Sequence, residues 1–218
     1  MNKITLQGPE IKPLSKGKAK QLVILLHGLG ANGEDLISLA PEFQDLLPDA
    51  HFISPNAPFP CDMSPFGFQW FSLQKRDLKS MIEGANGAIN AINEFIDEQM
   101  KRFDLTPDKV ALVGFSQGTM MSLYSALRRK KPIAGILGYS GAFLHEDKMD
   151  KEITAKTKIC LIHGNADAVV PFTAMVEAAK KMQKLEMEAE FYEMPGLGHG
   201  IDFEGIEIGK EFLGRILL

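Results

Sequence analysis

The sequence predicts an α/β fold built on a mostly parallel sheet with helices on both faces. Short apolar runs rich in β-branched residues alternate along the chain with segments in which apolar residues recur every three or four positions. The runs do not alternate apolar with polar residues, which is typical of strands covered on both faces. Parallel strands need crossover connections, and the helical segments supply them. Since no repeat or low-complexity tract interrupts this order, residues 1–218 are predicted to form one domain.

Six runs are predicted to be strands, and four segments are predicted to be helices. The strands are expected at Leu22–Leu26, His51–Ser54, Val110–Val113, Ile133–Gly138, Ile159–Ile162 and Ala189–Tyr192. The helices are expected at Met81–Phe103, Ser116–Arg129, Phe172–Leu185 and Gly205–Leu217. The segment Pro55–Asp77 shows neither pattern and is rich in proline and aromatic residues. It is predicted to be a long loop, and loops of this length are usually functional.

Composition and charge exclude several classes of protein. The 24 Lys and Arg residues against 28 Asp and Glu give a net charge of −4, which excludes a strongly basic nucleic-acid binder. No apolar run approaches the ~18 residues of a membrane-spanning helix, and Met1–Lys12 lacks the apolar core of a signal peptide. Cys61 and Cys160 are too few for a disulfide framework or a metal site, which favours a reducing compartment. We therefore expect a cytoplasmic protein without stable membrane anchoring.

The strongest local motif is Gly114-Phe115-Ser116-Gln117-Gly118, which lies between a predicted strand and a predicted helix. A sharp strand-to-helix turn of this kind exposes a nucleophilic serine, and the glycines let neighbouring backbone pass close by. The helix start behind the serine supplies unpaired N–H groups and the positive end of the helix dipole. The alternative is a serine that only caps the helix. The context favours Ser116 as a nucleophile.

A serine nucleophile needs a histidine base and an orienting carboxylate, which follow it in the order acid, then histidine, in this type of fold. His199 lies in a glycine-rich loop after the last predicted strand, and Asp167 follows the strand Ile159–Ile162. Both positions suit the required order. The other histidines are interpreted as structural or solvated: His27, His51, His145 and His163. Among the other acids, Asp147 and Asp150 are interpreted as solvated, and Asp202 breaks the order because it follows His199.

Acyl transfer also needs N–H donors for the oxyanion that forms on the carbonyl oxygen. One donor is expected to be the backbone N–H of Gln117, the residue after the nucleophile. The other is expected in the loop His27–Gly33, which follows the first predicted strand, and Leu29 is the candidate. A phosphate-binding loop is the alternative for this segment, but the spacing of its glycines does not fit one.

Several motifs together resemble the carboxylesterase/phospholipase family of small serine α/β-hydrolases: His27–Gly33, Gly114–Gly118, Gly164–Asp167 with Val169-Val170-Pro171, Gly198-His199-Gly200 and the loop Pro55–Phe71. This family includes acyl-protein thioesterases and lysophospholipases. The resemblance implies Ser116, Asp167 and His199 as the catalytic triad, Leu29 and Gln117 as the oxyanion hole, and a cytoplasmic enzyme with little or no lid that can form a homodimer. Two positions depart from the family pattern, Ser72 in place of an acid and Thr119 in place of a glycine.

The predicted function is hydrolysis of carboxylic esters with short to medium acyl chains through an acyl-enzyme, without a cofactor or metal. An acyl site must be apolar. The candidates are Met63, Phe66, Phe68, Trp70 and Phe71 in the long loop, together with Val169 beside the predicted acid. Alternatively, these aromatic residues only pack the loop onto the body of the protein. Two other functions stay open: a thioesterase or lysophospholipase acting on long chains, including acylated proteins, and a catalytically silent binding module.

Overall fold

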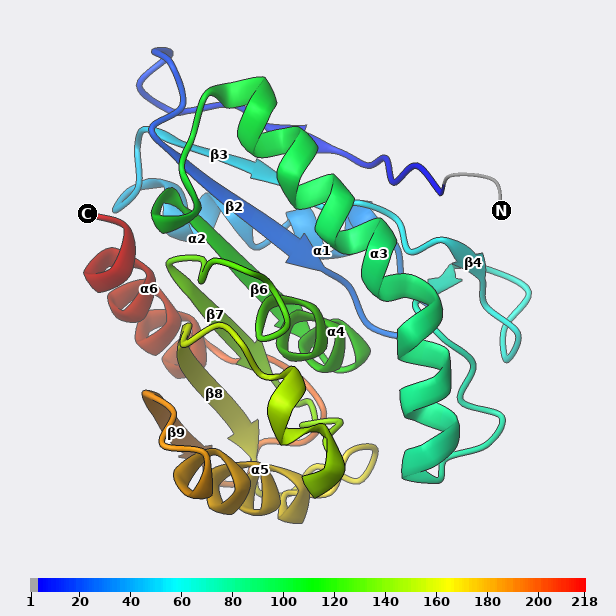
Figure 1. The fold of residues 1–218 in the computed structure, drawn as a ribbon. Coiled ribbons are helices and arrows are strands. Elements are labelled where there is room, and N and C mark those ends of the chain that lie inside the picture. Colours follow the sequence, from blue (N-terminus) through cyan, green and yellow to red (C-terminus); the bar gives the residue numbers. More distant parts are fainter. Residues whose placement is uncertain (1–3) are drawn as a thin grey trace.

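The computed structural model describes residues 4–218 and is built on a seven-stranded sheet with the order β1-β3-β2-β6-β7-β8-β9 (Figure 1). Within this sheet, as far as the chain is described, only the edge strand β1 is antiparallel to its neighbour, β3. The strands of this sheet are β1 (Glu10–Ile11), β2 (Gln21–Leu26), β3 (Ala50–Ile53), β6 (Val110–Phe115), β7 (Gly135–Tyr139), β8 (Lys158–Gly164) and β9 (Ala189–Met194). The predicted mostly parallel sheet is confirmed.

Six α-helices and two 3₁₀ turns connect the strands of the described chain. They are α1 (Gly33–Ile37), α2 (Ala40–Gln44), α3 (Leu78–Phe103), η1 (Pro107–Lys109), α4 (Gln117–Ala126), η2 (Asp147–Glu152), α5 (Thr173–Lys184) and α6 (Phe203–Leu217). All predicted strands and helices are present with shifted ends; the helix predicted over Ser116–Arg129, for example, ends at Ala126. The elements α1, α2 and β1 were not predicted, because they are too short to show a period of their own.

The predicted loop Pro55–Asp77 contains a small hairpin, which corrects the expectation that it has no regular structure. Strand β4 (Phe59–Pro60) pairs antiparallel with β5 (Phe68–Gln69). Two residues in each strand are too few to produce a visible alternation in sequence. The rest of the segment runs as bends and turns until Asp77, whose side chain accepts a hydrogen bond from Ser80 N and caps α3.

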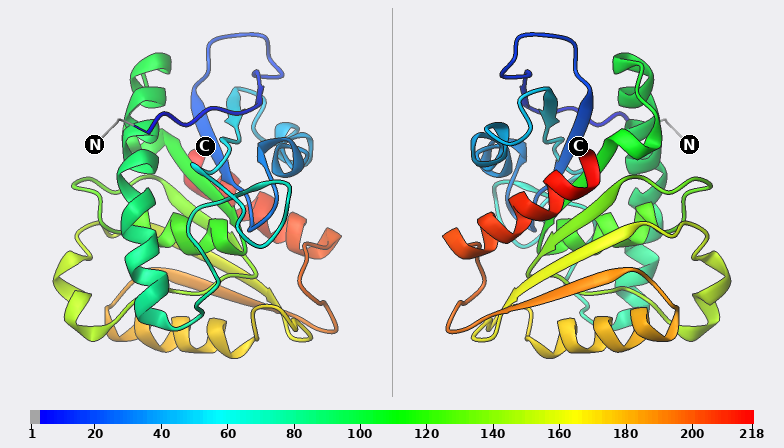
Figure 2. Two further views of the ribbon diagram at one scale, coloured as in Figure 1. Left: turned by 90° about the vertical axis from the view of Figure 1, so that its right-hand side faces the viewer. Right: turned by 90° about the vertical axis from the view of Figure 1, so that its left-hand side faces the viewer.

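Helices cover both faces of the sheet (Figure 2). The sheet separates two hydrophobic cores, one on each face. Strand β2 shows how they divide, because its successive side chains point to opposite faces. Leu22, Ile24 and Leu26 join the core under α3, α4 and α5, whereas Val23 and Leu25 join the core under α1, α2 and α6. Burial on both faces explains why this strand is a continuous apolar run.

The edge strand β1 is tied to the end of α3 by charge. The Arg102 guanidinium donates to both Glu10 carboxylate oxygens, at 2.7 and 3.0 Å. This contact with Arg102 lowers the pKa of Glu10 to about 2, against the opposing effect of burial, and a hydrogen bond with His51 adds to the lowering. The bonded pair therefore fixes the short strand against the helix.

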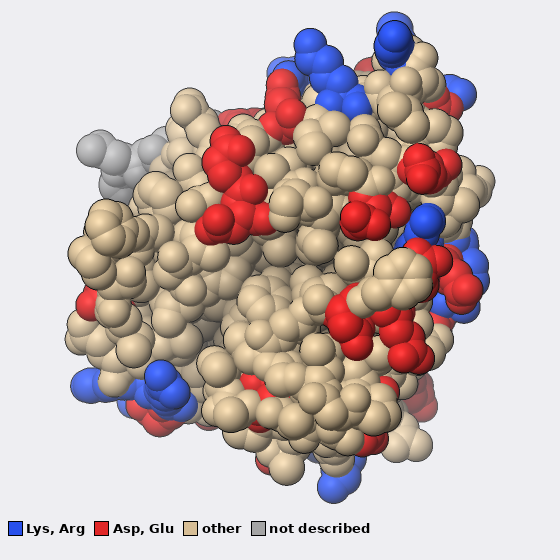
Figure 3. Space-filling view, turned by 180° about the vertical axis from the view of Figure 1, so that it is seen from behind, with Lys and Arg blue, Asp and Glu red and all other residues tan. Residues whose placement is uncertain are grey.

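The surface on the α1, α2 and α6 side carries scattered acidic side chains, with lysine and arginine gathered toward its edges (Figure 3). This face has no broad basic surface of the kind that binds nucleic acid. In the described residues, no helix has both the length and the apolar character needed to cross a membrane.

Candidate active site

The loops after β2, β6, β8 and β9 meet at the carboxyl ends of the parallel strands, where ligands of open α/β sheets bind. Each of these loops contains one of the motifs that the sequence singled out. The fold therefore brings together residues that are as far apart in the chain as Leu29 and His199.

Ser116 stands alone between the last residue of β6 and the first residue of α4. Its backbone has φ 54° and ψ −115°, outside the regions that L-residues normally occupy, which costs about 1–3 kcal/mol. The Ser116 N–H donates to Tyr139 O at 2.8 Å, and the residue is only 9% exposed. A Cβ at Gly114 would lie 2.5 Å from Thr119 N, and one at Gly118 would lie 1.7 Å from Leu26 O. Both flanking glycines are thus required by close backbone contacts.

Asp167 and His199 are joined directly. The Asp167 Oδ2 atom lies 2.7 Å from His199 Nδ1, the Asp167 side chain is fully buried, and the His199 side chain is 18% exposed. Asp167 Oδ1 accepts the N–H groups of Val169 and Val170 at 2.8 and 2.9 Å. Burial alone would raise the pKa of Asp167, but the bonds from His199 and the two N–H groups outweigh it and lower that pKa. The carboxylate is therefore held ionised and aimed at His199.

His199 lies close to the turn that holds Ser116, without a hydrogen bond between the two side chains. The Phe115 and His199 rings are 5.0 Å apart, which brings the imidazole beside the residue that precedes Ser116. Within residues 4–218, no hydrogen bond joins the Ser116 hydroxyl to His199. Such bonds are often long in ligand-free enzymes and tighten when substrate binds.

The two candidate oxyanion donors are free. Leu29 follows β2 and Gln117 is the first residue of α4, and neither backbone N–H donates to an acceptor in the described chain. An N–H at the start of a helix has no partner within the helix. Neither group is therefore engaged elsewhere, as the predicted role in binding an oxyanion requires.

The competing histidines have partners of their own. His27 Nδ1 bonds Gly28 O at 2.7 Å while its Nε2 accepts from Ala57 N at 3.0 Å, and burial lowers the pKa of this ring. His51 lies beside Glu10. His145 pairs with Asp150 at 2.7 Å. None of these rings faces Asp167.

His163 is the exception among the four, because it lies against the acid. Its Nε2 bonds Val170 O at 2.8 Å and is 3.3 Å from Asp167 Oδ2, with the ring only 2% exposed. The prediction that His163 is structural did not include a contact with Asp167. The spacing of four residues across the end of β8 was the only signal available.

The competing acids are engaged elsewhere. Asp202 caps α6, accepting Gly205 N at 2.8 Å. Asp147 pairs with Lys184 on the surface, and Asp150 pairs with His145. These contacts leave Asp167 as the carboxylate that meets His199.

The residues expected at the acyl site divide into exposed and buried groups. Met63 is 49% exposed, Phe66 is 79% exposed and Val169 is 58% exposed, so each can contact a substrate. Trp70 differs from the expectation, because it is 0% exposed and its indole N–H donates to His27 O. Phe71 is buried in the same way.

Two further residues lie near site residues in the sequence. Phe203, four residues after His199 and 74% exposed, was not singled out from sequence. Thr119, the departure from the family pattern, is buried and donates to Tyr139 O at 2.8 Å. Its side chain therefore fills the core beneath the nucleophile.

The sheet topology and the loops at its carboxyl edge define the chain as an α/β-hydrolase with a serine, acid and histidine arrangement. The family model described as Phospholipase/Carboxylesterase matches residues 8–217, so the chain belongs to that family.

Relatives and solved structures agree with the family. Acyl-protein thioesterase 1 of Emericella nidulans is 32% identical, over 97% of this chain and 96% of its own length. The crystal structure of esterase PE8 is 38% identical with a TM-score of 0.93, over 98% of this chain and 100% of its own. SOBER1 of Arabidopsis thaliana is 26% identical with a TM-score of 0.77, over 91% of this chain and 99% of its own. The predicted class, a carboxylic ester hydrolase, is confirmed.

Proposed function

We propose that this protein hydrolyses carboxylic esters of short to medium acyl chains through an acyl-enzyme on Ser116. The observation that carries the proposal is the 2.7 Å bond between Asp167 and His199 next to a serine in a strained turn. A weak nucleophile needs such a base, and the base needs an acceptor that fixes its tautomer.

In the proposed cycle, His199 Nε2 takes the Ser116 proton while Ser116 Oγ bonds to the carbonyl carbon. The carbonyl oxygen becomes an oxyanion, which accepts the N–H groups of Leu29 and Gln117. The tetrahedral intermediate collapses, and the leaving alcohol or thiol departs with the proton from His199. A water then attacks the acyl-enzyme by the same steps, releasing the acid and restoring Ser116.

Replacing the nucleophile tests this proposal. Ser116→Ala is expected to abolish p-nitrophenyl acetate hydrolysis and fluorophosphonate labelling while the circular dichroism spectrum stays unchanged. Asp150→Asn, in a partly buried pair outside the site, is the control and keeps both activities. Retained turnover in Ser116→Ala would remove the assignment of Ser116.

The exposed side chains of Met63, Phe66 and Val169 support an open, shallow acyl site. Each buried methylene contributes about 0.8 kcal/mol, so even a short groove discriminates chain lengths. A series of esters from acetate to palmitate measures the preference, and Phe66→Ala is expected to weaken it. A profile unchanged by this substitution would exclude Phe66 from the acyl site.

The alternative substrate class is a long-chain thioester or lysophospholipid, including an acylated protein. The relative named as an acyl-protein thioesterase supports it. Rates on an acyl-thioester, a lysophospholipid and a short ester, measured side by side, decide between the classes. A silent binding module is disfavoured by the intact acid–histidine pair, and covalent labelling of the wild type excludes it.

The compartment, the domain organisation and the oligomeric state are proposed from separate observations. Cys61 and Cys160 are free, which supports a reducing compartment such as the cytoplasm. The one seven-stranded sheet that runs through residues 4–218 supports one functional domain over 1–218. The homodimer implied by the family resemblance is tested by light scattering at assay concentration, where a monomer mass would exclude it.

A further inference from the structure

The two oxyanion donors come from different strands, so their spacing has to be set by something that contacts both. Leu29 lies just beyond β2 and Gln117 just beyond β6. The pairing of Leu26 with Gly114 in the sheet fixes the strand ends, but not the loop that carries Leu29 away from β2. An oxyanion donor has to lie 2.7–3.1 Å from the oxygen that it stabilises.

The segment 67–71 of the long loop holds the Leu29 side. Phe68 O accepts Gly30 N at 2.9 Å, and Phe68 N donates to Ala31 O at 2.8 Å. The Trp70 indole Nε1–H donates to His27 O at 2.9 Å. Leu29 therefore sits inside a stretch whose flanking residues are bonded on both sides to this one segment.

The same segment holds the Gln117 side. The Gln117 side-chain oxygen accepts Trp70 N at 2.8 Å, and its Nε2 donates to Phe71 O at 2.8 Å. Gln117 is 0% exposed, so no water competes for these bonds. The residue whose backbone N–H is the second donor is thus clamped through its side chain.

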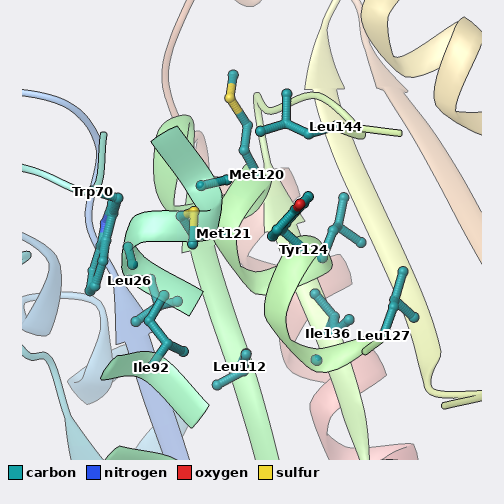
Figure 4. Packing of buried hydrophobic residues seen from close by; sticks show 14 of the residues in the cluster. Leu26, Trp70, Ile92, Leu112, Met120, Met121, Tyr124, Leu127, Ile136 and Leu144 are labelled. Atoms are coloured by element: carbon teal, nitrogen blue, oxygen red, sulfur yellow. The ribbon is translucent and has the colours of Figure 1, made fainter. Parts of the chain in front are cut away.

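Burial makes the segment rigid. Trp70 packs beside Leu26 and Met121 in the core on the α3 and α4 side (Figure 4). Phe71 is 2% exposed, and α3 passes it so closely at Gly84 that a Cβ there would lie 2.6 Å from Phe71 Cβ. A tightly packed segment does not bend easily, so it keeps the groups that are bonded to it in fixed positions.

From these contacts we infer that segment 67–71 is a brace that fixes the separation of the Leu29 and Gln117 N–H groups. Trp70 and the Gln117 side chain are its positioning residues. The inference rests on the proposed oxyanion role of Leu29 and Gln117. It gives the buried aromatic residues of the long loop a part in the reaction without contact with the acyl chain.

The test is Trp70→Phe, which keeps an aromatic ring but removes the indole N–H. Loss of the indole bond should move the Leu29 N–H by a fraction of 1 Å. Since a misplacement of 1 Å costs about 10²-fold in rate, kcat should fall about tenfold. KM is expected to stay within about twofold. Affinity for an alkyl boronate, which forms an anionic tetrahedral adduct on the serine, should fall by the same factor as kcat. Phe43→Leu, in the core on the other face, is the control and should lower Tm without changing kcat.

Gln117→Met provides a second variant in case Trp70→Phe does not fold. It removes both side-chain bonds but keeps the Gln117 N–H, and we expect the same fall in kcat. In the double variant the two losses of kcat should not add, because both substitutions disrupt the same brace. Two results would overturn the inference. One is an unchanged kcat in folded Trp70→Phe and Gln117→Met. The other is a fall in kcat in Phe43→Leu as large as the fall in the two brace variants, which would show that lost stability alone lowers kcat.

Failure of the brace and failure of the proposed mechanism are distinguishable. If Ser116 is not the nucleophile, the wild type does not form the boronate adduct. If only the brace is wrong, the wild type and both variants bind the boronate equally.

Discussion

Asp167→Asn is the substitution that tests the proposed site most sharply, because the surroundings dictate how the new amide must point. Asp167 Oδ1 accepts the N–H groups of Val169 and Val170, so the carbonyl oxygen of the asparagine has to stay on that side. Its NH₂ group then takes the place of Oδ2 and donates toward His199 Nδ1, 2.7 Å away. His199 must accept at Nδ1, which leaves Nε2 protonated and unable to take the Ser116 proton.

The size of the effect separates two explanations. A wrong tautomer lowers kcat by about 10⁴, which corresponds to roughly 5.5 kcal/mol in the activation free energy. Loss of only a charge-assisted hydrogen bond would cost about 1.5–3 kcal/mol, or roughly 10- to 150-fold. We therefore expect a fall near the larger value.

Steady-state hydrolysis of p-nitrophenyl acetate at pH 7 measures this effect, with Tm confirming that the variant is folded. Asp150→Asn is the matched control, since Asp150 bonds His145 Nε2 at the same distance of 2.7 Å outside the site, and it should keep kcat. A kcat for Asp167→Asn within tenfold of the wild type would refute the role of Asp167 in fixing the tautomer of His199.

Two further predictions concern stability. Ser116→Gly should raise Tm by about 2–4 °C relative to Ser116→Ala, because glycine relieves about 1 kcal/mol of net strain at φ 54° that alanine retains; equal Tm values would show that the turn is unstrained. Glu10→Gln should lower the unfolding free energy by about 1 kcal/mol at pH 7, a value reduced for the partly exposed Arg102. Since Arg102 lowers the pKa of Glu10 to about 2, from an ordinary 4.5, this stabilisation is complete above pH 4.5 and lost as the pH falls through 2. Urea unfolding at pH 7, 4 and 2.5 checks this, and a difference between variant and wild type that does not shrink at pH 2.5 contradicts it.

The sequence was informative where structure is local. The strand-to-helix turn at Ser116 follows from glycines two positions away on either side, and β2 follows from an unbroken apolar run. The pairing of Asp167 with His199 was anticipated from chain order and strand ends, since parallel strands finish at one edge. Short elements such as α1 and β4 were missed, because five or two residues contain too little periodicity.

The long loop shows why the remaining part of the site could not be predicted. The hydrogen bonds from this loop to Gln117 and His27 join residues 43 to 47 positions apart, and no local sequence pattern predicts such partners. An aromatic residue in a loop can line a substrate site or enter the core, and hydrophobicity alone does not separate these outcomes. Phe66 lies at the surface, 79% exposed, whereas Trp70 entered the core and is 0% exposed.

A buried tryptophan has a requirement that phenylalanine does not have, because its ring carries a polar group. A buried indole N–H has to find an acceptor, and a backbone carbonyl at a strand end is one of the few that a sheet leaves available. The His27 carbonyl, just beyond β2, provides it for Trp70. Phenylalanine has no such requirement, so it can stay at the surface without cost to the hydrogen-bond network. A tryptophan in a long loop that crosses the carboxyl edge of a parallel sheet is thus suited to brace the loops that bear the reacting groups.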